Sequence, residues 1–81
     1  MLYEAYLVKG IFTAFERERL RDAYNRGISQ YWDDAKDNPY PHDYTDEYIG
    51  GVVKDIFKGR GVNIQEQDVI YLTNTIRYYL L

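Results

Sequence analysis

From Leu20 onward, apolar and small residues recur at steps of three and four, which places them on one face of an α-helix. Upstream of this stripe, Thr13 and Glu16 match a capping box: Thr13 can accept a hydrogen bond from an early amide, and Glu16 can reach back. The pattern predicts one long helix over roughly residues 14–37. The stripe consists of Leu20, Ala23, Tyr24, Gly27, Ile28, Tyr31, Trp32 and Ala35.

A second helical stripe follows and predicts a helix over roughly residues 46–58. We expect Thr45 to cap this helix, because a threonine oxygen can accept from an amide of the first turn. Asp46 and Glu47 lie in that turn, where the helix dipole favours negative charge. Gly59 is expected to end the helix. Its apolar residues are Tyr48, Ile49, Val52, Val53, Ile56 and Phe57.

Between the two stripes lies the sequence Asn38-Pro39-Tyr40-Pro41. Each proline lacks an amide hydrogen and moves the residue before it out of the α region. The segment is therefore predicted to be a stiff, extended hinge that reverses the chain and forms a central αα-hairpin. In that hairpin two sets of residues should pack face to face, namely Leu20, Tyr24, Ile28 and Tyr31 on Ile49, Val52, Val53 and Ile56.

Three glycines lie inside the predicted helices: Gly27 and the pair Gly50-Gly51. A glycine in a helix interior costs about 1 kcal/mol relative to alanine. We expect this cost to be accepted because the helix backbones approach closely where they cross. The alternative is local fraying of the second helix at Gly50-Gly51.

The two ends of the chain carry more ambiguous patterns. Residues 2–9 fit a short helix closed by Gly10 or a strand, and we favour the helix. Residues 68–80 are rich in β-branched and aromatic residues, which favours a strand. However, Val69, Leu72 and Ile76 have helical spacing, and Asn63 with Glu66 can cap a helix. The fold-class prediction is an all-α domain of about four helices, with residues 1–81 forming a single small domain.

Three segments together resemble a known family: Ala23-Tyr24-Asn25-Arg26-Gly27, Asn38-Pro39-Tyr40, and Tyr48-Ile49-Gly50-Gly51-Val52. They are similar to the ribosome modulation factor family and its small plasmid- and phage-borne relatives of the CrpP type. This resemblance implies a ribosome-associated modulation or hibernation factor. The chain departs from the family in two respects: Tyr48 and Val52 stand where the family has tryptophans, and the ribosome binders of the family are strongly basic.

Aromatic residues are unusually frequent, with ten tyrosines, three phenylalanines and one tryptophan among 81 residues. Tyrosine combines a large apolar face with a polar tip, so the surplus favours a binding surface or a homodimer interface over a core filled with tyrosine. The apolar sequence Tyr78-Tyr79-Leu80-Leu81 adds to the homodimer hypothesis. The chain has no cysteine, no export signal and no apolar run of membrane-spanning length, so we expect a cytoplasmic protein.

Negative charge is concentrated around the hinge. Residues 22–47 carry seven acidic and two basic side chains, whereas the whole chain has a net charge of −3. Such a region repels phosphate, so direct nucleic-acid binding is not expected. It suits a basic protein surface, such as that of a nucleic-acid-binding host protein. The alternative is that these acids have no partner and simply mark a solvent-exposed helix end and the acidic first turn of the next helix. The candidate binding residues are Trp32, Asp33, Asp37, Tyr40, His42 and Tyr44.

Catalytic and metal-binding patterns are weak. His42 is the only histidine and Ser29 the only serine, and they lie on opposite sides of the hinge, so a catalytic dyad is not expected. A structural zinc site needs more histidines or cysteines than the chain contains. We therefore predict no cofactor, no metal and no enzymatic activity. The leading hypothesis is a non-enzymatic accessory protein of a phage or mobile element that binds and modulates or inhibits a host macromolecule.

Overall fold

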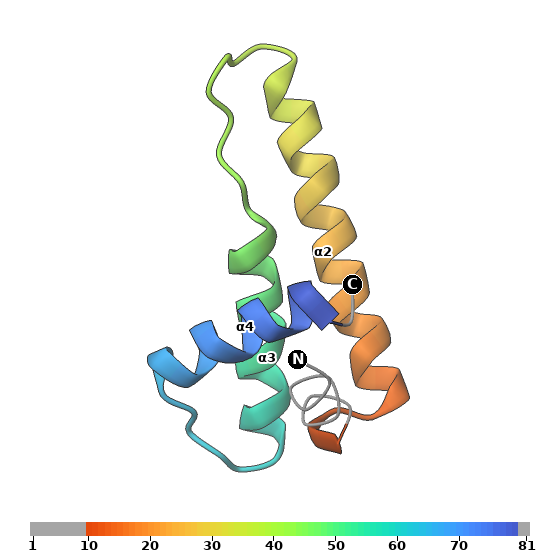
Figure 1. The fold of residues 1–81 in the computed structure, drawn as a ribbon, viewed down its shortest axis with the longest axis vertical. Coiled ribbons are helices and arrows are strands. Elements are labelled where there is room, and N and C mark those ends of the chain that lie inside the picture. The colour runs from red at the N-terminus through yellow and green to blue at the C-terminus, as the bar shows by residue number, and fades with distance from the viewer. Residues whose placement is uncertain (1–9, 80–81) are drawn as a thin grey trace.

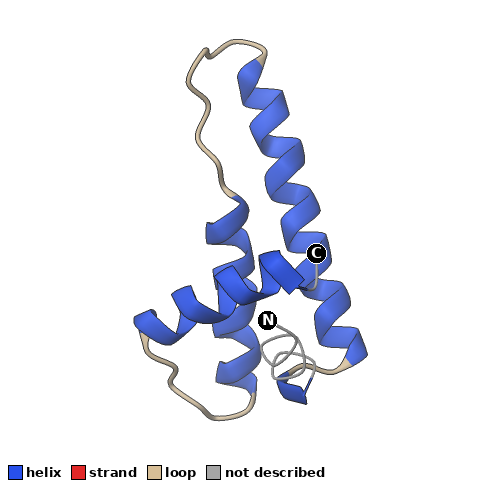
Figure 2. Cartoon of the chain, in the orientation of Figure 1, coloured by secondary structure: helices blue, strands red, loops and turns tan. Residues whose placement is uncertain are grey.

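A computed structural model describes residues 10–79, and these contain three α-helices and no strand (Figure 2). The helices are α2 (Ala14–Ala35), α3 (Thr45–Gly59) and α4 (Glu66–Tyr79). The longest helix, α2, packs beside α3, and α4 crosses α3 (Figure 1). The all-α class is thus confirmed, and residues 68–79 are helix rather than strand. About four helices are not confirmed, because the helix expected for residues 2–9 lies outside the described residues.

The start of α2 forms the predicted capping box. The Glu16 amide donates to Thr13 Oγ1 over 3.1 Å, and the Thr13 amide donates to Glu16 Oε1 over 2.9 Å. The helix ends at Ala35, two residues earlier than predicted, and the Asn38 amide donates back to the Asp34 carbonyl over 3.1 Å just beyond this end. The chain then continues without helix through residues 36–44.

The start of α3 differs from the prediction. Thr45 is the first helical residue and Tyr44 precedes it as the N-cap, so the prediction that Thr45 caps the helix is wrong. The reason is Asp43, whose Oδ1 accepts from both the amide and the hydroxyl of Thr45, over 2.9 and 2.6 Å. The hydroxyl is thereby engaged outside the helix, and the Thr45 side chain is fully buried.

The helix crossings explain one of the three interior glycines. A Cβ on Gly27 would lie 2.7 Å from the Thr45 Cα, so only glycine allows α2 to approach the start of α3 this closely. A Cβ on Gly50 would lie 3.4 Å from Val69 Cγ1, an ordinary van der Waals contact, so the crossing with α4 does not require glycine there. A Cβ on Gly51 would meet nothing within 4 Å, so the predicted close approach is wrong there. Helix α3 is continuous through Gly50 and Gly51, so the fraying alternative is also wrong.

The core lies where the three helices meet. Its α3 and α4 residues match the predicted stripes, but on α2 burial ends at Gly27. Ile28 and Tyr31 were predicted to pack on α3, and this is wrong: both are only partly buried and lie outside the core cluster. The last turns of α2 lie beside the non-helical residues 36–44 instead of beside a helix (Figure 1). The core consists of Phe12, Leu20, Ala23, Ile49, Val53, Ile56, Val69, Leu72 and Ile76.

The loop between α3 and α4 contains a residue that holds the start of the described chain. Arg60 donates to the carbonyl of Ile11 and to Glu16 Oε1, both over 2.7 Å. Its guanidinium also lies over the rings of Phe12 and Phe57, 5.8 and 5.2 Å from their centroids. Arg60 therefore closes the core at the ends of α2 and α3.

Helix α4 begins at Glu66, so the prediction that Asn63 caps it is wrong. The first amides of the helix, on Asp68 and Val69, instead donate to the Gln65 carbonyl, each over 3.0 Å. Ile64 is packed against the core just before this turn.

Candidate functional site

The six predicted binding residues lie at the end of the molecule away from the core. Trp32 and Asp33 are in the last turns of α2, and the other four are in residues 36–44, which we call the corner (Figure 1). Trp32 is 64% exposed and Tyr40 is 87% exposed, high values for large aromatic side chains. Asp33, Asp37 and His42 are exposed as well, whereas Tyr44 is partly buried.

The backbone of the corner is organised by local bonds. The amides of Lys36 and Asp37 donate to the carbonyls of Asp33 and Asp34 over 3.4 and 3.2 Å. The Tyr40 amide donates to Asn38 Oδ1 over 2.9 Å, which makes an Asx turn around Pro39. This turn presents the Tyr40 ring to solvent.

Four of the six residues form two separate groups rather than one cluster. In the first group, Trp32 packs edge-to-face on Tyr31 with centroids 5.2 Å apart, and Asp33 lies 3.4 Å from Lys36 Nζ. In the second group, His42 packs edge-to-face on Tyr44 with centroids 4.5 Å apart. Among the described residues no ring contact joins the two groups, so each is an independent part of the surface.

The second group continues into an aromatic row that the sequence analysis missed. Tyr44 stacks on Tyr48, with centroids 5.8 Å apart and planes inclined by 19°. The Arg26 guanidinium then lies 5.7 Å above the Tyr48 ring. The spacing of four residues between the tyrosines was a usable signal, but the contact with Arg26 depends on the helix register set by Gly27 and Thr45.

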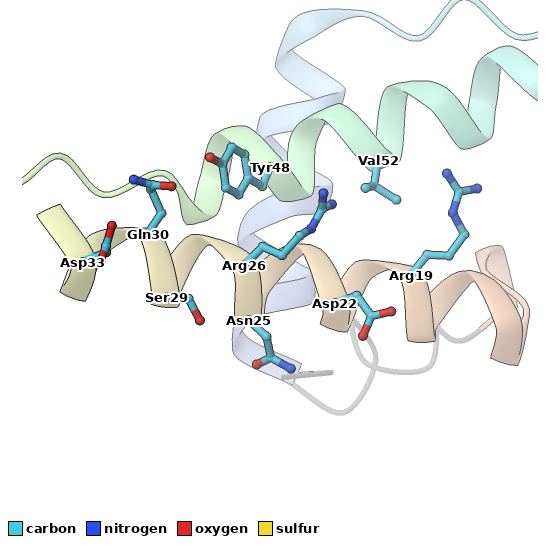
Figure 3. Close-up of a pocket in the computed structure, with 9 residues that line it drawn as sticks. All are labelled: Arg19, Asp22, Asn25, Arg26, Ser29, Gln30, Asp33, Tyr48 and Val52. Carbon is cyan, nitrogen blue, oxygen red and sulfur yellow. The ribbon is translucent and has the colours of Figure 1, made fainter.

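The aromatic row leads into an open groove between α2 and α3, shown in Figure 3. Arg19, Arg26 and Gln30 point toward α3, whereas Asn25 and Ser29 point away from it (Figure 3). Arg19 pairs with Asp55 over 2.8 Å, so the charge of one of the two arginines that line the groove is neutralised. The groove carries both charge signs and suits contact with a polymer surface better than enclosure of a small molecule. Its lining residues are Arg19, Asp22, Asn25, Arg26, Ser29, Gln30, Asp33, Tyr48 and Val52.

Several acids near the corner have structural roles. The hydroxyl of Thr45, followed by its amide, stabilises ionised Asp43 and lowers the pKa of that carboxyl. Asp46 accepts from Arg77 of α4 over 2.8 Å, and this bond raises the pKa of Arg77. Glu47 Oε1 lies 2.6 Å from His42 Nε2. Asp43 and Glu47 therefore tie the corner to α3, and Asp46 ties α3 to α4.

The acids at the end of α2 are more available. Asp34 accepts from Gln30 over 2.9 Å, and Asp33 is paired only with the exposed Lys36. The Asp37 side chain makes no hydrogen bond or ion pair with another described residue. Asp33 and Asp37 are therefore the acids of the corner region best able to meet a partner.

Two observations concern the residues considered for catalysis and metal binding. Within residues 10–79 no three His, Cys, Asp or Glu side chains are grouped to hold a metal ion. Ser29 lines the groove, but His42 is not among the lining residues. None of the helices in the described part of the chain has the length and apolar character needed to cross a membrane.

Comparison with known proteins finds no matching family model, no matching curated protein and no matching solved structure. Some residues behind the family resemblance are packing residues: Ala23, Gly27 and Gly50 are buried at the helix crossings. The same motif would serve any hairpin that crosses this closely. The resemblance therefore stays a prediction.

Proposed function

We propose that this protein is a non-enzymatic interaction protein that binds a basic protein surface through its corner end. The binding residues are Trp32, Asp33, Asp37, Tyr40, His42 and Tyr44. The observation that carries the proposal is that Trp32 is 64% exposed and Tyr40 is 87% exposed. Both lie near Asp33 and Asp37 in the sequence, and neither of these acids has a buried partner among the described residues. Tryptophan and tyrosine are the residues that most often anchor protein interfaces.

Charge supports a basic partner. Residues 22–47 carry seven acids against two basic side chains, and this excess attracts lysine- and arginine-rich surfaces while repelling phosphate. A nucleic-acid-binding host protein is a partner of this kind, with a basic surface built for phosphate. Occupying such a surface is one way for an accessory protein of a phage or mobile element to modulate or inhibit its host.

The proposed hinge supports binding as well. Pro39 and Pro41 restrict the backbone on both sides of Tyr40, and the Asx turn at Asn38 restrains it further. A restrained segment loses less conformational entropy on binding than a flexible loop does. Tyr40 is therefore held in position before the partner arrives.

A pull-down from bacterial lysate with charge-reversal variants tests the proposal. The wild-type chain should retain a basic protein, identified by mass spectrometry and then purified, with affinity that falls as salt is raised. The double variant Asp33→Lys/Asp37→Lys should lose that partner while its circular dichroism stays unchanged. The control is Glu18→Lys, which reverses one acid, as each of the two substitutions does. Glu18 lies at an exposed position of α2 remote from the corner. Equal losses in both variants, or no loss in either, would contradict the proposal.

Sedimentation with purified ribosomes tests the alternative, a ribosome-associated modulation factor. The proposal predicts no binding to ribosomal RNA or duplex DNA near physiological salt. Cosedimentation with ribosomes that survives or tightens in Asp33→Lys/Asp37→Lys would support the ribosome factor, because removing negative charge favours contact with RNA.

A further inference from the structure

Helix α4 has a second face that no described residue covers. Its inner face, with Val69, Leu72 and Ile76, packs on α3. The opposite face exposes three large side chains, because Ile70, Tyr71 and Tyr78 are 55%, 50% and 84% exposed. The outer face, as we call it, contains no charged residue and consists of Gln67, Ile70, Tyr71, Asn74 and Tyr78.

The spacing on the outer face is that of a helix–helix seam. Gln67, Tyr71, Asn74 and Tyr78 follow one another at steps of four, three and four. Such steps keep a line of side chains facing a second helix over consecutive turns. Tyrosines and amides alternate along this line, so each tyrosine hydroxyl has an amide available to it when the line meets a reversed copy of itself.

We infer that the outer face binds the outer face of a second copy of this chain, with the two α4 helices antiparallel. A two-fold axis between Leu72 and Thr73 places Tyr71 against Asn74 of the second copy. The same axis places Tyr78 against Gln67 of the second copy. Both pairs join an aromatic ring to an amide side chain, so the seam is complementary to itself.

The distribution of charge favours a second copy of the chain on the outer face, with the two α4 helices antiparallel. The chain has a net charge of −3 with the acids concentrated at the corner, so pairing two copies through their corners would bring like charges together. The outer face avoids this because it is uncharged. Glu66 and Asp68 lie at the start of α4 and Arg77 near its end. An antiparallel pair keeps the two acidic starts apart, whereas a parallel pair would bring them together.

The size of the face sets the strength of the dimer. A helix of 14 residues is about 21 Å long, and one helix pair buries less than the roughly 800 Å² per partner of a standard interface. We therefore expect a reversible dimer with a dissociation constant on the order of micromolar rather than a permanent one.

Analytical ultracentrifugation of the full chain over a range of concentrations tests the dimer. The wild-type chain should shift from one to two chain masses as concentration rises. Tyr71→Glu should raise the dissociation constant at least about tenfold, because it brings a charge into the uncharged seam. Phe15→Glu is the control, since Phe15 is 74% exposed on α2 and outside this face. A single-chain mass at all concentrations, or equal weakening by both variants, would overturn the inference.

Disulfide trapping tests whether the two α4 helices are antiparallel. The chain has no native cysteine, so only the introduced cysteines can form disulfides. Copies carrying Gln67→Cys are mixed with copies carrying Tyr78→Cys under mild oxidation. The antiparallel seam predicts mixed disulfides in excess over those between identical copies, because each cysteine faces the other type. Positions 67 and 78 are about 17 Å apart along the helix, so identical cysteines stay separated. An excess of disulfides between identical copies would show a parallel pair and reject the antiparallel seam.

Discussion

The two halves of α2 have the same apolar spacing but different surroundings. In the first half, Leu20, Ala23 and Gly27 are buried against α3 and the core. In the second half, which begins at Ile28, no residue is buried, and Trp32 is 64% exposed. The difference shows that an apolar stripe defines which side of a helix can be covered, while the neighbouring element decides whether it is.

The boundary between the halves is the contact of Gly27 with Thr45. Helix α3 begins there, so α2 has a helical neighbour below this contact and only the corner above it (Figure 1). The first half can thus contribute to stability, and the second half is available for recognition. This division leads to four predictions, given in order of decreasing effect.

The largest contrast should come from shortening one apolar side chain in each half. Leu20 is 1% exposed, so Leu20→Ala should lower the free energy of unfolding by roughly 2–5 kcal/mol. Ile28 is only partly buried and outside the core, so Ile28→Ala should cost less than about 1.5 kcal/mol. Urea unfolding followed by circular dichroism measures both. Equal costs would show that the second half of α2 is packed as well as the first.

The boundary itself is tested by two glycine substitutions. Gly27→Ala should destabilise by roughly 1–3 kcal/mol, because its new Cβ would lie 2.7 Å from the Thr45 backbone. Gly51→Ala places its Cβ in open space and should stabilise by up to about 1 kcal/mol through helix propensity. The thermal midpoints should therefore move in opposite directions. A Gly27→Ala variant as stable as the wild type would mean that the helices can separate at no cost.

The corner's attachment to α3 should depend on pH through Asp43. Asp43→Ala leaves the buried Thr45 hydroxyl and its amide without their acceptor, which should cost about 1–3 kcal/mol at neutral pH. Because the two hydrogen bonds from Thr45 lower the pKa of Asp43 in the folded protein, this stabilisation is complete above the unfolded pKa. It is lost as the pH falls through the lower folded pKa, so the wild type and variant should converge below about pH 4.

Urea titrations across a series of pH values would show the convergence. Asp37→Ala serves as the control, because Asp37 is exposed and its side chain has no partner among the described residues. This variant should match the wild type at every pH. A constant difference for Asp43→Ala down to strong acid would refute the role of its ionised carboxylate.

The smallest effect on stability is expected at the exposed aromatic residues. Trp32→Ala and Tyr40→Ala should each change the free energy of unfolding by no more than about 0.5 kcal/mol, because both side chains face solvent. The same variants should weaken binding of the purified basic partner at least about tenfold. Substantial destabilisation with unchanged binding would assign these rings to the fold.

Local signals in the sequence were sufficient for much of this fold. The capping box needs only Thr13 and Glu16, and the buried stripe of α4 follows from the spacing of Val69, Leu72 and Ile76. The end of burial at Gly27 could not be predicted in this way. It depends on which residue of α2 packs on the start of α3, and this register is set by the close approach of Gly27 to Thr45.

The candidate site was predictable to a similar degree. Proline restriction and acidic composition are properties of the segment itself, so the exposed Tyr40 and the acids around it follow from local sequence. The aromatic row is different, because Tyr48 meets Arg26 only in the observed register of α2 against α3. That register is set by Gly27 and Thr45, which are 18 positions apart in the chain.

Arg60 has a consequence for the order in which the chain folds. Its partner Glu16 is 44 positions away, whereas Gly27 and Thr45 are separated by 18. Closing the longer loop costs about 0.8 kcal/mol more chain entropy, so the α2–α3 crossing should form first and the Arg60 contacts later. Phe12, held under the Arg60 guanidinium, then enters the core last. Its amide and its neighbours should accordingly exchange hydrogen for deuterium before those of α3 do.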